Sequence, residues 1–126
     1  MTKPILVVDD SQTTRLGLEH FLQQLGHDVI PTASAEEALK LVDRGLEPKM
    51  AIVDYNLPGD NGVTLIRGLR SRTSCRFIPI VVMSTEFRET LRAEARSAGA
   101  TGWLVKPATV PRLSELLATL LPHDGN

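Results

Sequence analysis

Five residues that can do chemistry stand at the ends of apolar runs. Asp9 and Asp10 follow one run, Asp54 follows another, and Ser84 and Lys106 end two more. Crowded carboxylates repel one another unless a hard cation neutralises them, and Mg²⁺ accepts one or two carboxylates while keeping water and substrate oxygens. A carboxylate can also be a nucleophile toward phosphorus, while an ammonium and a hydroxyl neutralise phosphoryl oxygens. Brought together, these residues would form a phosphoryl-transfer site.

Each of these residues also has an ordinary structural interpretation. Asp9 and Asp10 can cap a following helix, because carboxylates favour helix N-termini. Asp54 can simply favour the turn in IVDYNLPGDNG, and Ser84 can cap the next helix. Lys106 is harder to explain in this way, because the end of a covered strand should not carry an unpaired ammonium. The surrounding elements must decide between the two interpretations.

Short apolar runs alternate with helical patterns along the chain, which predicts five strands and five helices. Pro31 cannot donate a hydrogen bond to a sheet, so its strand belongs at an edge. Ser34 and Glu37 form a capping box in which each side chain satisfies the other's backbone donor. The fourth helix is expected from about Phe87 to Ala98, and Thr109 is expected to cap the fifth. The predicted strands are Ile5–Val8, Asp28–Thr32, Met50–Val53, Phe77–Met83 and Thr101–Val105.

Continuous rather than alternating apolar strands indicate a parallel α/β sheet covered by helices on both faces. Right-handed crossovers and an edge position for the second strand fit the order 2-1-3-4-5 of flavodoxin-like, doubly wound folds, although propensity alone does not fix it. Ligands of such sheets bind beyond the carboxyl ends of the strands, where the order reverses. The five residues at the strand ends should therefore converge, within one domain covering residues 1–126.

Four segments, VVDDS, IVDYNLPG, VVMS and GWLVKP, in this order and spacing, resemble the receiver domain of bacterial response regulators. The resemblance covers nearly the whole chain. It implies a phosphorylation-activated signalling switch of a two-component system, in which Asp54 accepts a phosphoryl group from a histidine kinase or a histidine phosphotransfer protein. It also implies that Ser84 and Lys106 bind the phosphoryl oxygens and that the bond before Pro107 is cis.

The same resemblance implies a Mg²⁺ (or Mn²⁺) site. Asp10, Asp54 and the backbone carbonyl of Asn56 would hold the metal, and Asp9 would reach it through water. Asn56 and Glu86, two residues after Asp54 and Ser84, would flank the phosphoryl group and govern the access of hydrolytic water. This pair resembles the chemotaxis branch of the family, which implies a short-lived phosphoryl group.

Two positions depart from the family pattern. Trp103 stands where Tyr or Phe is usual at the aromatic switch position, so the switch formed by Ser84 and Trp103 would have to move a larger ring. Plain packing is the alternative for Trp103. Asp60 replaces a residue that is usually apolar in the turn after Asp54. The sequence gives no reason for Asp60.

A partner-binding face is the second hypothesis from the resemblance. Arg88, Arg92 and Arg96 recur every four residues, which places them on one stripe of the fourth helix. The family's usual output face comprises the fourth helix, the fifth strand and the fifth helix, so these arginines together with Trp103 are candidates to contact a downstream protein. A solvated helix face is the alternative.

Composition limits the other classes of function. The chain has 126 residues, 42% of them apolar, and 14 basic against 15 acidic residues give a net charge of −1. This balance provides no electrostatic argument for nucleic acid or an anionic membrane. The single cysteine, Cys75, cannot form an internal disulfide, and no apolar run approaches a membrane span. We expect a cytoplasmic protein that is a monomer or dimerises on phosphorylation.

Two rival functions remain open. The first is a phosphorelay intermediate or phosphate sink without a dedicated output. The second is a Mg²⁺-dependent phosphohydrolase of the haloacid-dehalogenase type, which also forms an aspartyl phosphate but places a second Asp two residues after the first. Asn56 occupies that position here, and no substrate-specificity insert is visible. We therefore expect a phosphoacceptor that performs at most its own phosphorylation and dephosphorylation, not an enzyme.

Overall fold

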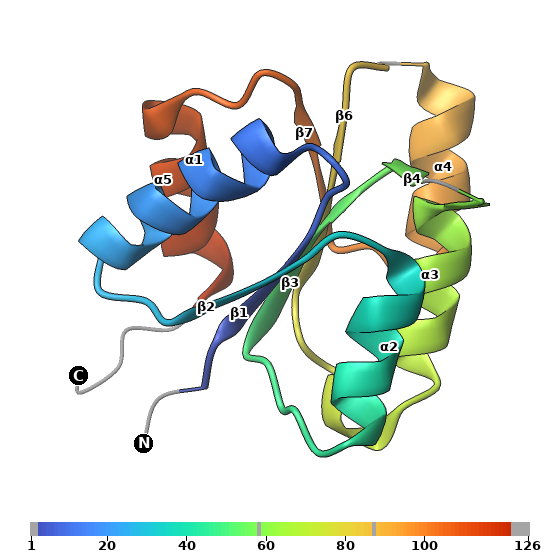
Figure 1. Ribbon diagram of the computed structural model, residues 1–126. Helices are drawn as coiled ribbons and strands as arrows, with labels where there is room; N and C mark the ends of the chain where they lie inside the picture. Colours follow the sequence, from blue (N-terminus) through green and yellow to red (C-terminus); the bar gives the residue numbers. More distant parts are fainter. Residues whose placement is uncertain (1–2, 58, 87, 122–126) are drawn as a thin grey trace.

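A computed structural model describes residues 3–57, 59–86 and 88–121, without the side chain of Asp60. Its parallel sheet has five strands in the order β2-β1-β3-β6-β7, and a two-stranded hairpin, β4-β5, lies apart from it (Figure 1). The strands are β1 (Ile5–Val8), β2 (Val29–Thr32), β3 (Met50–Asp54), β4 (Asn56–Leu57), β5 (Asp60–Asn61), β6 (Ile80–Ser84) and β7 (Gly102–Val105). The helices are α1 (Gln12–Gln24), α2 (Ala35–Asp43), α3 (Gly62–Arg70), α4 (Glu89–Ala98) and α5 (Val110–Leu120), with a 3₁₀ turn η1 (Thr73–Cys75).

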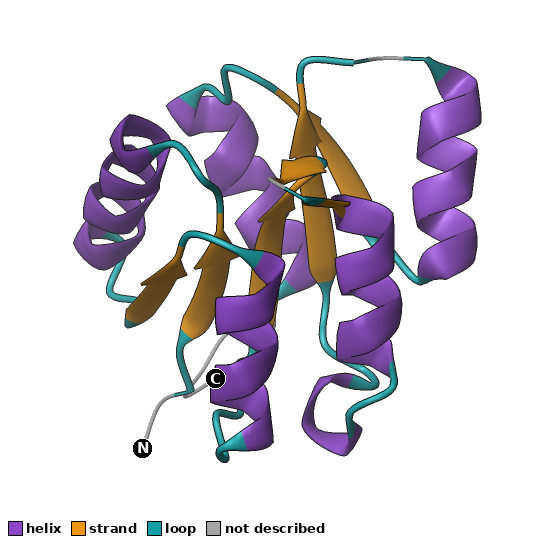
Figure 2. Ribbon diagram, turned by 45° about the vertical axis from the view of Figure 1, so that its right-hand side comes forward, coloured by secondary structure: helices purple, strands orange, loops and turns teal. Residues whose placement is uncertain are grey.

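The sheet lies between two layers of helices, which Figure 2 shows as orange strands flanked by purple helices. Successive residues of a strand point to opposite faces. Ile5 and Val7 of β1 thus pack with α1 and α5, whereas Leu6 and Val8 pack with α2 and α3. All four are fully buried. This two-sided burial explains the continuous apolar runs, and it confirms the predicted doubly wound fold and strand order.

One predicted strand begins too early. The prediction started it at Phe77, but β6 begins at Ile80, and Phe77 is 90% exposed. Arg70 explains the difference, because its Nη1 donates to the carbonyls of Arg76 and Ile78 at 3.1 and 2.6 Å. These carbonyls are therefore engaged by a side chain and are not part of the sheet. The predicted start of the fourth helix, Phe87, lies outside the described residues.

The helix starts follow the capping chemistry of the sequence, with one correction. Ser34 Oγ accepts from the Glu37 N–H at 3.1 Å, as a capping box requires. Glu37 Oε1, however, accepts from the Ala33 N–H at 2.7 Å, one residue before the expected donor. Thr109 caps α5 as predicted. Asn61 caps α3, which the sequence did not indicate.

The β4-β5 hairpin was also not predicted, because two-residue strands carry no periodicity. It returns the chain to Gly62, whose N–H donates to the Tyr55 carbonyl at 2.7 Å. A Cβ at Gly62 would lie 2.8 Å from the Asp54 carbonyl oxygen. Only glycine fits this close approach. Among the described helices, none has the length and apolar content needed to cross a membrane.

Candidate functional site

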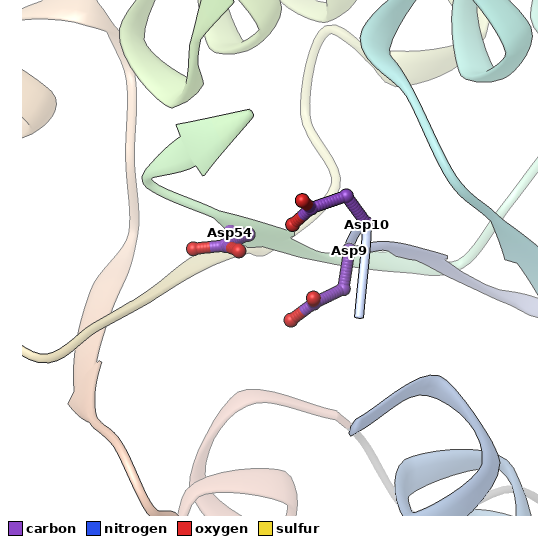
Figure 3. Close-up of side chains that lie close together, drawn as sticks. All are labelled: Asp9, Asp10 and Asp54. Carbon is purple, nitrogen blue, oxygen red and sulfur yellow. The ribbon is translucent and has the colours of Figure 1, made fainter. Parts of the chain in front are cut away.

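Three carboxylates lie together at the carboxyl ends of β1 and β3 (Figure 3). Asp9, Asp10 and Asp54 each offer one ligand atom, and these atoms lie within 4.8 Å of one another. The strand register explains why Asp9 and Asp54 lie close together. Val8 of β1 is paired with Val53 of β3, and an aspartate follows each of these valines in the chain. Asp9 and Asp54 are 2% and 6% exposed, whereas Asp10 is exposed. The cluster is thus buried on one side and open on the other.

Lys106 reaches this cluster from the end of β7. Its Nζ lies 2.9 Å from Asp9 Oδ2 and 3.1 Å from Asp54 Oδ2, so one ammonium bridges two carboxylates. Only 19% of the lysine side chain is exposed. The peptide bond to Pro107 is cis, as the family resemblance implies. The expected convergence of the strand ends is therefore present for the three aspartates and the lysine.

Burial and charge shift the protonation of this group. Burial is the main reason that the pKa of Asp54 is raised above its ordinary 3.8, and the charge of Asp9 raises it further against the opposing effects of the Asn56 N–H and Lys106. Burial would lower the pKa of Lys106, but its bonds to Asp9 and Asp54 outweigh this and raise it. Lys106 therefore remains an ammonium. An added cation would relieve the remaining repulsion between carboxylates.

Of these residues, Asp54 stabilises a turn, whereas Asp9 and Asp10 do not cap a helix. Ser11 caps α1, so neither Asp9 nor Asp10 does so, and Asp9 Oδ1 instead accepts from the Ser11 N–H at 2.8 Å. Asp54 does stabilise its own turn, because its Oδ1 accepts from the Asn56 N–H at 3.1 Å. That bond leaves Oδ2 facing Lys106. Asp54 is thus a turn residue and a member of the cluster at once.

Ser84 ends β6, the strand next to β3, and is fully buried. Its Oγ accepts from the Glu86 N–H at 3.0 Å. Capping of the fourth helix by Ser84 is wrong, because the N-cap residue of α4 is Arg88, without a side-chain cap hydrogen bond. The hydroxyl is therefore available for another role at the carboxyl edge of the sheet.

Trp103 connects this loop to the face formed by α4 and β7. Its Nε1 donates to the Glu86 carbonyl at 3.1 Å, and its ring centroid lies 5.8 Å from that of Tyr55. The residue is only 8% exposed, so the indole does not present its ring to a partner in this conformation. Sequence reasoning overlooked Tyr55, although its place directly after Asp54 could have indicated it.

The arginine stripe needs a correction. Arg88 precedes α4, so only Arg92 and Arg96 lie on this helix. Arg88 pairs with Glu86 at 3.0 Å, and Arg96 lies 3.8 Å from Glu89. Arg92, Arg96 and Trp103 line a cavity of about 160 Å³. The basic face is therefore smaller than the sequence spacing suggested.

Comparison with known proteins identifies the family of this fold and site. The sequence pattern of the response regulator receiver domain matches residues 5–118. The chain belongs to the response regulator receiver domain family. Chemotaxis protein CheY1 of Helicobacter pylori is 36% identical to it over 118 residues, which are 93% of this chain and 95% of the relative. A CheY homolog of Campylobacter jejuni is 35% identical, with 93% and 91% covered.

Solved structures of receiver domains agree with the fold. CheY4 of Vibrio cholerae superposes with a TM-score of 0.90 at 32% identity, over 96% of this chain and 100% of that chain. A response regulator protein of Burkholderia multivorans superposes with a TM-score of 0.79 at 37% identity, over the whole of both chains. This CheY-like receiver domain is thus a phosphorylation-activated signalling switch, a kind of protein distinct from classical enzymes.

Proposed function

We propose that Asp54 is the phosphoacceptor of this receiver domain and that a histidine kinase or a histidine phosphotransfer protein is its donor. The supporting observation is that Asp54 is paired with a cation and lies beside two further carboxylates. Lys106 Nζ lies 3.1 Å from Asp54 Oδ2, and oxygens of Asp9, Asp10 and Asp54 lie within 4.8 Å of one another. A simple turn residue needs neither neighbour.

The donor set fits a hard divalent cation. Receiver domains are generally Mg²⁺-dependent, and closely spaced carboxylates with an exposed member suit Mg²⁺, which keeps several waters. Asp10, Asp54 and the Asn56 carbonyl would hold Mg²⁺ or Mn²⁺, with Asp9 acting through water. When bound, the metal would neutralise charge on the phosphoryl oxygens and on the carboxylates.

The residues of this chain divide the transfer between them. An oxygen of Asp54 attacks phosphorus, the phosphorus–nitrogen bond of the phosphohistidine breaks, and the imidazole leaves with the electron pair. The raised pKa of Lys106 keeps its ammonium charged, so it can bind a phosphoryl oxygen in place of one carboxylate contact. The buried Ser84 hydroxyl is proposed to bind another. Positioning and charge neutralisation are the main requirements of phosphoryl transfer.

Signal output is proposed to follow from the loop after β6. If Ser84 Oγ turns to a phosphoryl oxygen, its contact with the Glu86 N–H changes, and Glu86 is tied to Trp103 through its carbonyl. The surface near Arg88, Arg92, Arg96 and Trp103 would then shift toward a form that binds a downstream protein. Charge reversal at Arg92 and Arg96 should weaken partner binding without affecting phosphorylation.

Labelling of the full chain tests the proposal. With Mg²⁺ and radiolabelled acetyl phosphate, wild type should take up about one phosphoryl group, and Asp54→Ala should take up none. Equal labelling of the two proteins would disprove the assignment. Many turnovers of a phosphomonoester would instead support the phosphohydrolase. Return of label from the chain to a histidine phosphotransfer protein, without binding of another target, would support a phosphorelay role.

Two narrower proposals complete this function. Asn56 and Glu86 are proposed to leave water access to the phosphoryl group, so decay should take minutes and not many hours. The receiver domain is proposed to fill residues 1–126 and to act in the cytoplasm, as a monomer or as a dimer formed on phosphorylation. Sedimentation with and without beryllofluoride would distinguish these two states.

A further inference from the structure

A cavity with a mainly apolar lining lies at the amino ends of the strands, away from the carboxylate cluster. Its volume is about 350 Å³, and it is lined by the segments that precede β2, β3 and β6 and by the end of α5. The apolar residues of the lining are Phe77, Ile78, Pro79, Leu120 and Leu121. Phe77 is 90% exposed, so it contributes almost nothing to the core. Apolar residues gathered in this way mark an interaction site more often than a single exposed side chain does.

Three cations at this end of the sheet form no salt bridge with any described residue. Lys49 lines the cavity and is half-buried, and Arg76 is exposed next to Phe77. Arg70 donates only to uncharged oxygens, among them the carbonyls of Arg76 and Ile78. A half-buried ammonium without an anionic partner is costly, so a partner that brings a carboxylate to Lys49 would be favoured.

The carboxylates at this end of the sheet already have partners. Glu47 lies 3.2 Å from Lys3, and Asp43 lies 2.9 Å from Arg72. Asp28, which precedes β2, is engaged as well. The cavity is therefore bordered by apolar side chains and by cations whose charge these carboxylates do not offset. A complementary partner would combine an apolar side chain with negative charge.

We propose that an acidic segment of a partner protein docks here, with one of its apolar side chains in the cavity. The docking site, called here the amino-end surface, comprises Lys49, Arg76, Phe77, Ile78, Leu120 and Leu121. A small molecule held in the cavity would leave Phe77 in water, whereas an extended segment also covers this ring. A second copy docked through the same surface would bring like cations together, which opposes association.

The amino-end surface lies at the opposite end of β3 from Asp54. Lys49 precedes this strand and Asp54 ends it, and a strand of 5 residues spans about 16 Å. Arg70 also holds the segment before β6, because it donates to the carbonyls of Cys75 and Ile78 at 3.0 and 2.6 Å. Docking should therefore be equally strong before and after phosphorylation. This last expectation rests on the proposed function, in which Asp54 carries the phosphoryl group.

Fluorescence anisotropy on the full chain tests the docking. The probe is a short labelled peptide of leucines flanked by aspartates, and two matched peptides carry lysines in place of the aspartates or serines in place of the leucines. Wild type should bind the first peptide about tenfold more tightly than either of the others, because each replacement removes one of the two contributions. Mg²⁺ with beryllofluoride should change this affinity by less than about twofold.

Substitutions on the amino-end surface locate the binding. Phe77→Ser should weaken it about tenfold without lowering the melting temperature, because this ring is already exposed. Leu16→Ser is the matched control, since Leu16 is 56% exposed on α1 and lies outside the cavity. Lys49→Glu should reverse the preference, so that the lysine peptide binds better than the aspartate peptide. Lys40→Glu, on α2, should keep the wild-type preference.

Several results would overturn the inference. They are failure of wild type to prefer the aspartate peptide, undiminished binding by Phe77→Ser, and an unchanged preference in Lys49→Glu. A dimer in sedimentation that is lost in Phe77→Ser would instead assign the surface to a second copy. Binding to phosphatidylglycerol vesicles but not to the peptide would assign it to a membrane. Tighter peptide binding by Asp124→Asn would mean that the chain's own carboxylate competes for the surface.

The dependence on phosphorylation is decided separately. A change of more than about threefold on addition of Mg²⁺ and beryllofluoride would refute equal docking in the two states. Absence of phosphoryl label on Asp54 would refute the proposed function. It would not alter the peptide affinities, which are measured without a phosphodonor.

Discussion

Two cations lie at opposite ends of the strands of the sheet. At the amino ends, called here the fixed edge, Arg70 donates to neutral carbonyls. At the carboxyl ends, called here the reactive edge, Lys106 bridges two carboxylates. Arg70 contacts the carbonyls of Gly99, Cys75 and Ile78 at distances from 2.6 to 3.0 Å, and so joins α3 to the segments before β6 and β7. Lys106 lies 2.9 and 3.1 Å from carboxylates that repel each other. Both cations are partly buried, but their surroundings differ in kind.

The difference places groups that stabilise the fold at the amino ends of the strands and reactive groups at their carboxyl ends. Around Arg70, burial lowers the pKa, yet the guanidinium satisfies carbonyls that would otherwise be left without donors. Around Lys106, the carboxyl of Asp54 retains a raised pKa despite its cation. One edge is thus arranged to remain fixed. The other holds charges that are not fully compensated, as expected where function is favoured over stability.

Asp54→Asn should have the largest effect and tests the reactive edge. The label should be lost completely, because the amide cannot act as the nucleophile. The melting temperature should rise by a few degrees at neutral pH. In a domain of this size, that rise corresponds to a gain of roughly 1 kcal/mol or less in the free energy of unfolding. A raised pKa means that ionisation of Asp54 costs stability as the pH rises above 3.8. The gain should therefore disappear below that pH. A lower melting temperature at neutral pH would contradict the comparison.

Arg70→Ala should have the opposite sign and tests the fixed edge. Several carbonyls would lose their donor at once, so we expect a loss of about 3 kcal/mol in the free energy of unfolding. Urea denaturation measures it, and Arg67→Ala, an exposed position of the same helix, should change it by less than about 0.5 kcal/mol. Label on Asp54 per folded molecule should stay at the wild-type level. A clear fall in that ratio would mean that the two edges are not independent.

Gly62→Ala should perturb the reactive edge by shape alone. The new Cβ would lie 2.8 Å from the Asp54 carbonyl oxygen and 3.0 Å from Tyr55 Cα, so backbone must move, at a cost of about 2 kcal/mol. The labelling rate should fall as well, because Asp54 shifts. Gly17→Ala is the control: a Cβ there meets nothing within 4 Å, and helix propensity should stabilise α1 by about 0.5–1 kcal/mol. Equal effects at both glycines would exclude the steric explanation.

Trp103→Phe should have the smallest effect and tests how the reactive edge connects to the α4 surface. Phenylalanine keeps an aromatic ring but cannot donate to the Glu86 carbonyl, so the free energy of unfolding should fall by about 1 kcal/mol. In wild type, the fluorescence of this single tryptophan should change on addition of Mg²⁺ and beryllofluoride. An unchanged spectrum would favour plain packing over a switching role.

The sequence by itself determined the fold and the members of the cluster. Continuous apolar runs require a sheet buried on both faces, and this arrangement brings the strand ends that carry Asp9, Asp54 and Lys106 to one edge. The apolar runs and the charged residues that follow them are local signals, because each depends on residues adjacent in the chain. Thr109 as a helix cap and the edge position of the strand containing Pro31 were predicted for the same reason.

Only the tertiary structure decided which partner each charged group takes. The side chain of Arg70 reaches the carbonyl of Ile78, a contact that no sequence pattern predicts. For this reason β6 begins later than the sequence predicted. Arg88 seemed part of a helical stripe but precedes α4 and pairs with Glu86. Lys106 could be expected to have a partner, but not to bridge two. Long flexible side chains choose among several partners within reach, and packing of distant segments determines which of these are close enough.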